Sequence, residues 1–357
     1  MDSRERTFLA LERQAGDRIP VDFWASRAMI HKLERGLGMS HEQFLDRYDV
    51  DLRYIPGPAY IGPPLRGGKD IWGVRRIAVD VCVKGGVESY QEVAESPLAA
   101  AGDVGSIASY AHWPSPDWFD YSVIAAQCDA VRAKGRVVVF MGDRLNRVAQ
   151  LKPAMYLRGL EDIFIDLAVR PQVAHAILSK IRGFYLLYLE RILEAARAKI
   201  DIVLTGDDFG AQNGPLISPA MWLTFIQPVF AEYIRLIHGY GARAMHHTCG
   251  SVAEIIPDMI ACGLDVLQSI QPEAAGMSLR DLKAAFGGQL CFHGGISIQR
   301  TMPFGTPDEI RQEVRRIADV VGSDGGYILG TAHNIQADTS VENVQALMEA
   351  YREYGRR

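Results

Sequence analysis

The feature that most restricts the fold of this chain is the alternation of short apolar runs with longer helical patterns. Eight runs have the β-branched, apolar character of strands, and they cover residues 18–25, 51–55, 136–143, 200–208, 243–250, 265–272, 289–296 and 325–335. Near-continuous apolar runs of this length are typical of parallel strands buried on both faces. Helix start signals, such as Ser218 before Pro219 and Ser340 before Val341 and Glu342, stand between the later runs. The alternation therefore predicts a parallel sheet with helical crossovers.

Eight such units in 357 residues predict one (β/α)8 TIM-type barrel domain that spans residues 1–357. The stretch 56–100 is rich in glycine and proline, and we expect it to form a β-hairpin insertion after strand 2, able to fold over the barrel mouth. The sequence has no G-x-G-x-x-G turn followed by a helix, and no P-loop. A doubly wound open sheet is the competing architecture.

Composition and charge exclude several classes of function. The net charge of −5 gives no electrostatic reason to expect nucleic acid or an anionic membrane as a partner. No apolar stretch reaches the roughly 18 residues of a membrane span, and the charged N-terminus does not resemble a signal peptide. The five cysteines are scattered and form no disulfide framework. We therefore expect a cytoplasmic protein.

Polar residues gather at the carboxyl ends of the predicted strands, where the active sites of such barrels form. Four of the nine histidines lie at the ends of only three strands, which points to one shared pocket. The polar residues at these ends are Asp143, Arg144, Asp207, Asp208, His246, His247, Thr248, Cys249, Gln271, His293, His333 and Asn334.

The stretch "MHHTCGS" (residues 245–251) is the strongest chemical signal among them. Side chains alternate along a strand, so His247 and Cys249 face the same way, and a pair with this spacing is able to hold one ion. Zinc accepts imidazole nitrogen and thiolate sulfur, and a catalytic zinc has three protein ligands and one open position. His333 and His293 are the candidates for the third ligand. The competing interpretation is that the cysteine is a small buried apolar residue and the histidines belong to the core.

The other polar residues are candidates for catalysis and substrate binding. Asp207 and Asp208 point to opposite faces, so one carboxylate faces the pocket and the other bonds to backbone amides or caps a turn. Asp143 is a third candidate carboxylate, with Arg144 beside it as an anion-binding group. Substrate contacts are expected from the remaining residues at the strand ends, which are His246, Gln271, His293 and Asn334.

Four segments together resemble the uroporphyrinogen decarboxylase superfamily, namely residues 206–222, 246–272, 292–297 and 325–344. That superfamily has a (β/α)8 fold and also contains cobalamin-dependent methyltransferases. Its true decarboxylases need no metal and hold their substrate with a carboxylate after an early strand. This chain has "RYIPGP" (53–58) there, without an aspartate. Its "RQAGDR" (13–18) precedes the first strand, although the similar motif of the decarboxylases follows it.

The methyltransferase branch, similar to methylcobamide:thiol methyltransferases, holds zinc with a His-x-Cys pair and a later cysteine. His247 and Cys249 match the pair, and His333 stands where the later cysteine falls. The resemblance implies a zinc-dependent methyltransferase that moves a methyl group between a corrinoid and a small acceptor. The corrinoid would arrive on a partner protein or as free cobalamin. Asp207, Asp208 and Asp143 would position the acceptor or supply a fourth ligand. The alternatives are a metal-free decarboxylase or lyase acting on a small carboxylate, and a non-catalytic corrinoid- or tetrapyrrole-binding protein.

Overall fold

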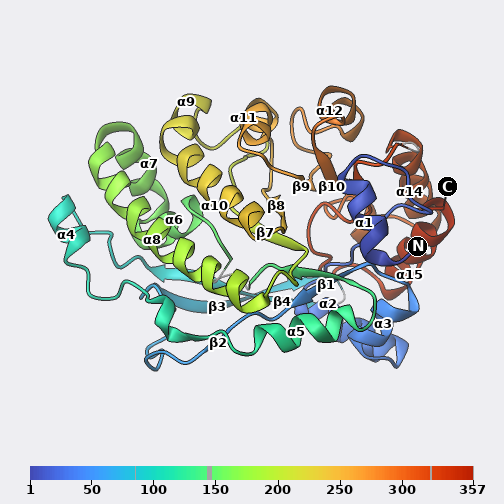
Figure 1. Ribbon diagram of the computed structural model, residues 1–357, viewed down its shortest axis with the longest axis horizontal. Helices are drawn as coiled ribbons and strands as arrows, with labels where there is room; N and C mark the ends of the chain where they lie inside the picture. The colour runs from blue at the N-terminus through green and yellow to red at the C-terminus, as the bar shows by residue number, and fades with distance from the viewer. Residues whose placement is uncertain (85, 143–146, 322–323, 357) are drawn as a thin grey trace.

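The architecture is a curled parallel β-sheet with helices packed on its outside (Figure 1). The computed structural model describes residues 1–84, 86–142, 147–321 and 324–356. The sheet has seven strands in the order β1-β6-β7-β8-β9-β10-β11, and each neighbouring pair is parallel. The strands are β1 (Leu52–Ile55), β6 (Val137–Phe140), β7 (Ile202–Gly206), β8 (Arg243–His247), β9 (Val266–Ile270), β10 (Cys291–Gly294) and β11 (Tyr327–Ile328). This mixed α/β arrangement is consistent with a TIM-like fold.

The first expected strand, residues 18–25, does not form a regular strand. Among the described residues it makes only isolated bridges, which are parallel from Val21 to Leu329 and from Ala25 to Ile335 and antiparallel from Arg18 to Arg356. Pro20 within this segment has no N–H, so it cannot donate to a continuous ladder. The segment still contacts both edges of the sheet, because the amide of Asp22 donates to Leu329 at 2.8 Å and the carbonyl of Val21 accepts from Asp51 at 2.9 Å.

Helices connect the strands and cover the outside of the sheet (Figure 1). Two of the predicted start signals act as N-caps, since Ser218 accepts from the amide of Met221 and Ser340 from that of Asn343. Among the described residues, no helix is both long enough and apolar enough to span a lipid bilayer. The α-helices are α1 (Ser3–Leu11), α2 (Arg27–Leu37), α3 (His41–Arg47), α4 (Val104–Ala108), α5 (Ile124–Arg132), α6 (Leu151–Arg158), α7 (Leu160–Val169), α8 (Pro171–Ala196), α9 (Pro219–Met221), α10 (Gln227–Gly239), α11 (Ile256–Ala261), α12 (Leu279–Phe286), α13 (Thr301–Phe304), α14 (Pro307–Val321) and α15 (Val341–Tyr354).

The chain between β1 and β6 contains two small antiparallel sheets. One pairs β2 (Ala59–Tyr60) with β5 (Phe119–Asp120), and the other pairs β3 (Arg75–Val83) with β4 (Gly86–Glu95). A two-stranded hairpin is marginal by itself. A buried carboxylate, Glu88, fixes β4 to the main body by accepting from Ser26 Oγ and from the amide of Ala337, both at 2.6 Å. The description of this region as an insertion into a barrel stays a prediction.

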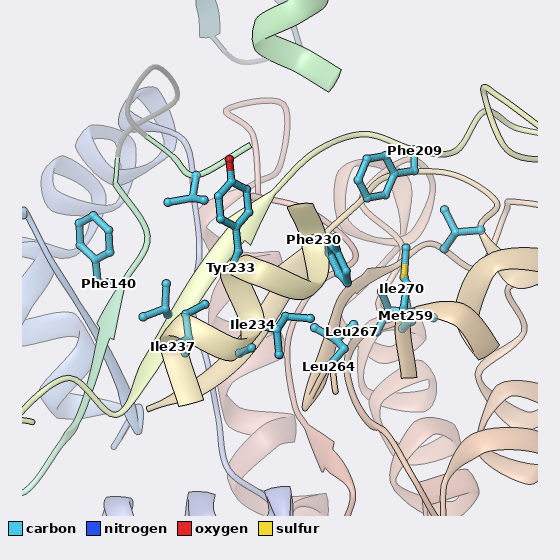
Figure 2. Packing of buried hydrophobic residues seen from close by; sticks show 14 of the residues in the cluster. Phe140, Phe209, Phe230, Tyr233, Ile234, Ile237, Met259, Leu264, Leu267 and Ile270 are labelled. Carbon is cyan, nitrogen blue, oxygen red and sulfur yellow. The ribbon is translucent and has the colours of Figure 1, made fainter. Parts of the chain in front are cut away.

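Two apolar clusters lie on the two sides of the sheet. The outer cluster fills the space under the helices, and on α10 its members Phe230, Ile234 and Ile237 follow a helical spacing (Figure 2). Truncation of a fully buried ring such as Phe230 to alanine would cost about 3–5 kcal/mol. Apart from Leu11 of α1, the inner cluster consists of alternate strand residues, including Leu204 and Met245. This alternation decides which later residues of each strand point into the sheet's interior.

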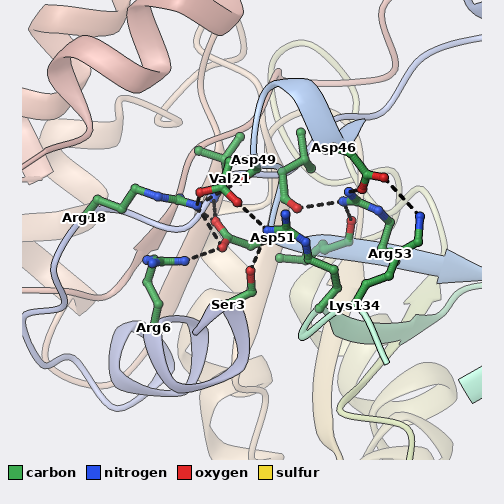
Figure 3. A network of polar contacts seen from close by, with 12 residues as sticks. Ser3, Arg6, Arg18, Val21, Asp46, Asp49, Asp51, Arg53 and Lys134 are labelled. Atoms are coloured by element: carbon green, nitrogen blue, oxygen red, sulfur yellow. Dashed lines mark hydrogen bonds and ion pairs between the residues drawn. The ribbon is translucent and has the colours of Figure 1, made fainter. Parts of the chain in front are cut away.

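Ion pairs lie where the strands begin, at the end opposite to the polar strand ends (Figure 3). Asp51 is fully buried just before β1, and it accepts from Arg6 and Arg18 at 2.6 Å and from the amide of Val21 at 2.7 Å. These bonds satisfy a carboxylate that would otherwise be costly to bury. In TIM-type barrels, residues at this end of the strands contribute to stability, and residues at the opposite end form the active site.

Candidate metal centre

The alternation of side chains along the strands directs three polar side chains toward the interior of the curled sheet. Met245 on β8 and Val266 on β9 belong to the inner cluster, so His247 and Gln268, two residues further on, follow them inward. On β10, Cys291 is likewise followed by His293. Cys249 lies two residues after His247, just past the end of β8, so its side chain points to the same side as that of His247.

His247, Cys249 and His333 bring one ligand atom each within 4.8 Å of one another. The thiol Sγ of Cys249 lies 3.5 Å from Nε2 of His247. A tetrahedral zinc with bonds of about 2.0–2.3 Å places its ligand atoms about 3.5 Å apart. The donor set of two imidazoles and one thiol is also one that zinc accepts. These three residues therefore fit a zinc ion, with one coordination position left for another group.

A hydrogen bond fixes the orientation of His247. Its Nδ1 lies 2.7 Å from Oε1 of the buried Gln268, so Nδ1 carries the proton and the lone pair of Nε2 faces Cys249. Burial, followed by the positive charges of His333 and Arg147, lowers the pKa of His247 well below its ordinary value. A neutral imidazole with its Nε2 lone pair available is the form that binds a metal.

Without a metal, the thiol of Cys249 holds its proton. Burial, followed by the negative charge of Asp208, raises the pKa of this thiol to about 12. A positive ion at this position would reverse that effect, because a coordinating thiol is deprotonated. Metal binding would then release a proton, so the metal affinity should rise with pH.

The two adjacent aspartates have different surroundings. Asp207 is buried and accepts from three backbone amides at the start of α6, those of Gln150, Leu151 and Lys152, at 2.5–2.9 Å. It therefore caps this helix. Asp208 pairs with the ammonium of Lys152, and its Oδ1 lies 3.9 Å from Nε2 of His247. Asp208 is thus the carboxylate that lies beside His247, Cys249 and His333, the candidate metal group.

Ser269 holds a strained position beside these residues. Its φ of +78° is in the left-handed region that non-glycine residues avoid, at a cost of about 1–3 kcal/mol. Its hydroxyl donates to the carbonyl of Ala332, next to His333. The kink interrupts the alternation of β9, so Gln268 faces inward while Ile270 joins the outer cluster. Ser269 thus connects the strand that orients His247 to the loop that carries His333.

A cavity of about 800 Å³ opens beside the candidate metal group. His247, His333 and Asn334 line it on the side of the parallel sheet, and residues 87–91 of β4 also contribute to its wall. Trp24 lines it as well, and its ring lies 5.4 Å from that of His247 and 5.0 Å from that of His333. The hairpin and the candidate metal group therefore share one cavity.

The remaining predicted site residues are not part of the three-residue group. Nε2 of His293 is bonded to Asp22 at 2.8 Å. Gln271 accepts from the amide of Gly250 at 3.1 Å. The ring of His246 stacks on Phe209 at 5.1 Å, and its Nδ1 lies 2.8 Å from Thr205 Oγ1, which are the surroundings of a core residue. Asp143 and Arg144 lie outside the described residues.

Four residues that were not predicted from the sequence complete this region, namely Trp24, Lys152, Gln268 and Ser269. Lys152 and Trp24 come from segments far from the histidines, and nothing in their local sequence marks them. Gln268 did carry a signal, because it is a polar residue inside an apolar strand run, two places from an inward-facing valine. A polar side chain at such a position needs a buried partner.

The fold and the donor set define a TIM-like α/β protein with a candidate metal centre at the carboxyl ends of its strands. Residues 148–354, more than half of the chain, match the family model described as Uroporphyrinogen decarboxylase (URO-D). The chain therefore belongs to the uroporphyrinogen decarboxylase family.

Similar proteins include both chemistries of this superfamily. Uroporphyrinogen decarboxylase of Actinobacillus succinogenes is 25% identical over 190 residues, which cover 52% of this chain and 50% of that protein. Methylcobamide:CoM methyltransferase MtaA of Methanosarcina barkeri is 29% identical over 171 residues, which cover 47% and 45%. The chain spans about half the length of the curated relatives it matches. A methyltransferase structure from Methanosarcina mazei shares the fold with a TM-score of 0.69, at 18% identity over 99% of both chains.

Proposed function

We propose that this protein is a zinc-dependent methyltransferase that moves a methyl group between a corrinoid and a small acceptor. The observation that carries the proposal is the convergence of His247, Cys249 and His333 on one point beside a cavity. The similarity to a methylcobamide methyltransferase supports it, and so does the shared fold of a methyltransferase structure.

In this transfer, a nucleophilic atom of the acceptor forms a bond to the methyl carbon and loses its proton. The carbon–cobalt bond breaks and leaves its electron pair on the cobalt of the corrinoid. His247, Cys249 and His333 would hold the zinc, which when bound supplies Lewis acidity that lowers the pKa of an acceptor group at its open position. The corrinoid would come on a partner protein or as free cobalamin.

The surrounding residues of the chain have positioning roles in this proposal. Gln268 keeps Nε2 of His247 directed at the site. Asp208 lies close enough to orient the acceptor or to fill the fourth position before the acceptor arrives. Lys152 holds Asp208 by an ion pair, so the position of the carboxylate is set from α6. A fixed geometry of this kind is what accelerates a bimolecular transfer.

Metal-free decarboxylation, the chemistry of other family members, receives less support from the aspartates. Asp207 accepts hydrogen bonds from three backbone amides, so its carboxylate stabilises the start of α6. Asp208 is paired with Lys152 and lies beside two imidazoles and a thiol. An acid–base role of Asp208 alone would leave the purpose of Cys249 unexplained.

The test is demethylation of free methylcobalamin by the zinc-loaded protein, followed by absorbance with a panel of thiols and acidic arenes as acceptors. We expect turnover that depends on zinc and falls at least 100-fold in Cys249→Ala and in His333→Ala, which is about 2.7 kcal/mol of transition-state stabilisation. Cys262→Ala is the matched control and should keep full activity. Release of CO₂ from a carboxylate substrate by metal-free protein, without methyl transfer, would contradict the proposal.

A further inference from the structure

The end of β9 contains a β-bulge, and Ser269 is its extra residue. Along the parallel pair of β9 and β10, Gln268 lies opposite His293, whereas Ile270 lies opposite the next residue, Gly294, so the register passes over Ser269. Bulges are common beside active sites, where they change the direction of one side chain. The bulge therefore gives the side chain of Ser269 a direction that regular alternation would not give it.

Serine is an unexpected residue at this position of the strand. Of the described non-glycine residues with a positive φ, Ser269 is the only one inside a β-strand. Its φ of +78° is one that glycine adopts without strain, and glycine is the usual residue of left-handed bulge positions. Serine differs from glycine by its hydroxymethyl group. Because this group brings the strain with it, its contacts should explain why it is present.

The hydroxyl of Ser269 holds the residue that precedes His333. It is buried and donates to the carbonyl of Ala332. The amide of Ala332 donates to the carbonyl of Ile296 at 2.8 Å, so both backbone groups of Ala332 are bonded to neighbouring segments. The carbonyl of His333 in turn accepts from Oγ1 of Thr331 at 2.6 Å. The backbone at His333 is therefore fixed from both sides.

His333 is the residue of the candidate metal group that most needs such support. His247 is the last residue of β8, and Cys249 follows two residues later. In contrast, β11 ends at Ile328, so His333 lies on the loop that follows this strand. Side chains on loops are held less precisely than those on strands unless other contacts fix them. The bond from Ser269 ties this loop to β9.

The neighbouring strand β10 packs its backbone against both the bulge and the loop. Gly294 has a φ of +107°, and a Cβ at this position would lie 3.0 Å from the amide nitrogen of Ile270 and 3.2 Å from the carbonyl oxygen of Thr331. No ordinary side chain fits at such distances without a shift of the backbone. The bulge and the loop are thus packed closely enough for one hydroxyl to set their relative position.

We propose that Ser269 is a positioning residue of the candidate zinc site: its hydroxyl holds the loop after β11 so that the imidazole of His333 meets the ion shared with His247 and Cys249. The left-handed backbone at Ser269 is needed because it turns the hydroxyl toward Ala332. The inference rests on the zinc site of the proposed function, and it does not depend on methyl transfer, on the corrinoid or on the acceptor.

The experiment measures zinc affinity by chelator competition and the absorption spectrum of the cobalt(II)-loaded protein, for Ser269→Ala and Ser269→Gly. We expect both variants to bind zinc at least about 10-fold more weakly, the lower end of the usual effect of losing an outer partner of a metal ligand. The cobalt spectrum should change toward that of His333→Ala, because the ion loses an imidazole in each case. Ala198→Gly is the matched control, since it relieves a φ of +57° at an exposed position before β7, and it should change neither quantity.

Urea unfolding of the metal-free variants separates positioning from a merely structural role. Ser269→Ala loses the hydroxyl and keeps the strain, whereas Ser269→Gly loses the hydroxyl and relieves the strain. The unfolding midpoint of Ser269→Gly should therefore be no lower than that of Ser269→Ala, although both bind zinc weakly. A zinc affinity that returns to the wild-type value in Ser269→Gly would overturn the inference, because the hydroxyl would then be dispensable.

A double-mutant cycle tests whether Ser269 acts through His333. In the His333→Ala background, Ser269→Ala should lower zinc affinity by less than about 3-fold, because the residue it positions is already gone. The thiol of Cys249 is the other candidate target: burial raises the pKa of this thiol, and the hydroxyl of Ser269 acts against the rise. An equal loss of zinc affinity in both backgrounds would assign the action of the hydroxyl to Cys249 and would overturn the inference.

This inference and the proposed function fail in different ways. Wild-type zinc affinity and an unchanged cobalt spectrum in Ser269→Ala would overturn the inference and leave the zinc site intact. Tight zinc binding that depends on Ser269, without transfer of a methyl group from methylcobalamin, would support the inference and contradict the proposed function alone. A wild-type protein that binds no zinc would contradict both.

Discussion

Substitution of Gln268 by methionine should weaken zinc binding without weakening the fold. Gln268 is 1% exposed, and its Oε1 is the hydrogen-bond partner of His247 Nδ1 at 2.7 Å. Loss of such a partner behind a metal-binding histidine typically lowers metal affinity 10–100-fold. This corresponds to about 1.4–2.7 kcal/mol of binding free energy.

The effect on stability has two opposing contributions. Removing the acceptor leaves Nδ1 of His247 without a partner, at a cost of about 1–3 kcal/mol. The substitution also removes the amide nitrogen of Gln268, which is buried without a hydrogen-bond partner in the described part of the chain, and so relieves a similar penalty. Methionine fills nearly the same volume. We therefore expect the free energy of unfolding of the zinc-free protein to change by less than about 1 kcal/mol.

Two assays separate these effects. Competition with a chromophoric chelator gives the zinc dissociation constant, and urea unfolding in the presence of EDTA gives the stability of the zinc-free protein. Gln289→Met, at an exposed position, is the matched control and should change neither quantity. Unchanged zinc affinity in Gln268→Met would refute the orienting role. A stability loss of about 3 kcal/mol or more would instead make Gln268 a structural residue.

Three further predictions concern the same region. Cys249→Ala should lose most of the bound zinc in a metal analysis, because one of three ligands is gone, whereas Cys262→Ala should keep it. Asp207→Asn should lower the free energy of unfolding by about 1 kcal/mol in urea titrations, because α6 loses part of its N-terminal cap; full stability would show that the cap is dispensable. Burial opposes ionisation of Asp208, but the charge of Lys152 outweighs it and holds the pKa of this carboxyl well below its ordinary value. The resulting stabilisation is present above about pH 4 and is lost as pH falls toward the folded-state pKa. Urea titrations of zinc-free protein should therefore show the advantage over Asp208→Asn shrinking below pH 4, and a pH-independent difference would contradict this.

The parallel sheet was predictable because its strands are buried on both faces and so read as apolar runs. Seven of the eight expected runs contain a strand of the sheet. The run at 18–25 was wrong as a regular strand, since Pro20 interrupts the hydrogen bonding even though Ile19, Val21 and Phe23 are buried as in a strand. An apolar pattern indicates that a segment is buried, but it does not indicate whether the segment forms the continuous backbone hydrogen bonds of a strand.

The clustering of His247, Cys249 and His333 was partly predictable for a similar reason. The two-residue spacing of His247 and Cys249 fixes a common face by parity, and the order of the strands brings His333 to the same end. Parity left open which of Asp207 and Asp208 faces the site, and the answer depends on α6 and Lys152, more than 50 residues earlier in the chain. Contacts of that kind are set by tertiary packing, which no local pattern encodes.

The most direct test of the central claim, that His247, Cys249 and His333 form a zinc site, is X-ray absorption at the zinc edge of the zinc-loaded protein. We predict one tightly held zinc per chain with a single sulfur at about 2.3 Å and imidazole nitrogens at about 2.0–2.1 Å. The sulfur contribution should disappear in Cys249→Ala and persist in Cys262→Ala. Failure to retain stoichiometric zinc after dialysis, or a first coordination shell without sulfur in the wild-type protein, would contradict it.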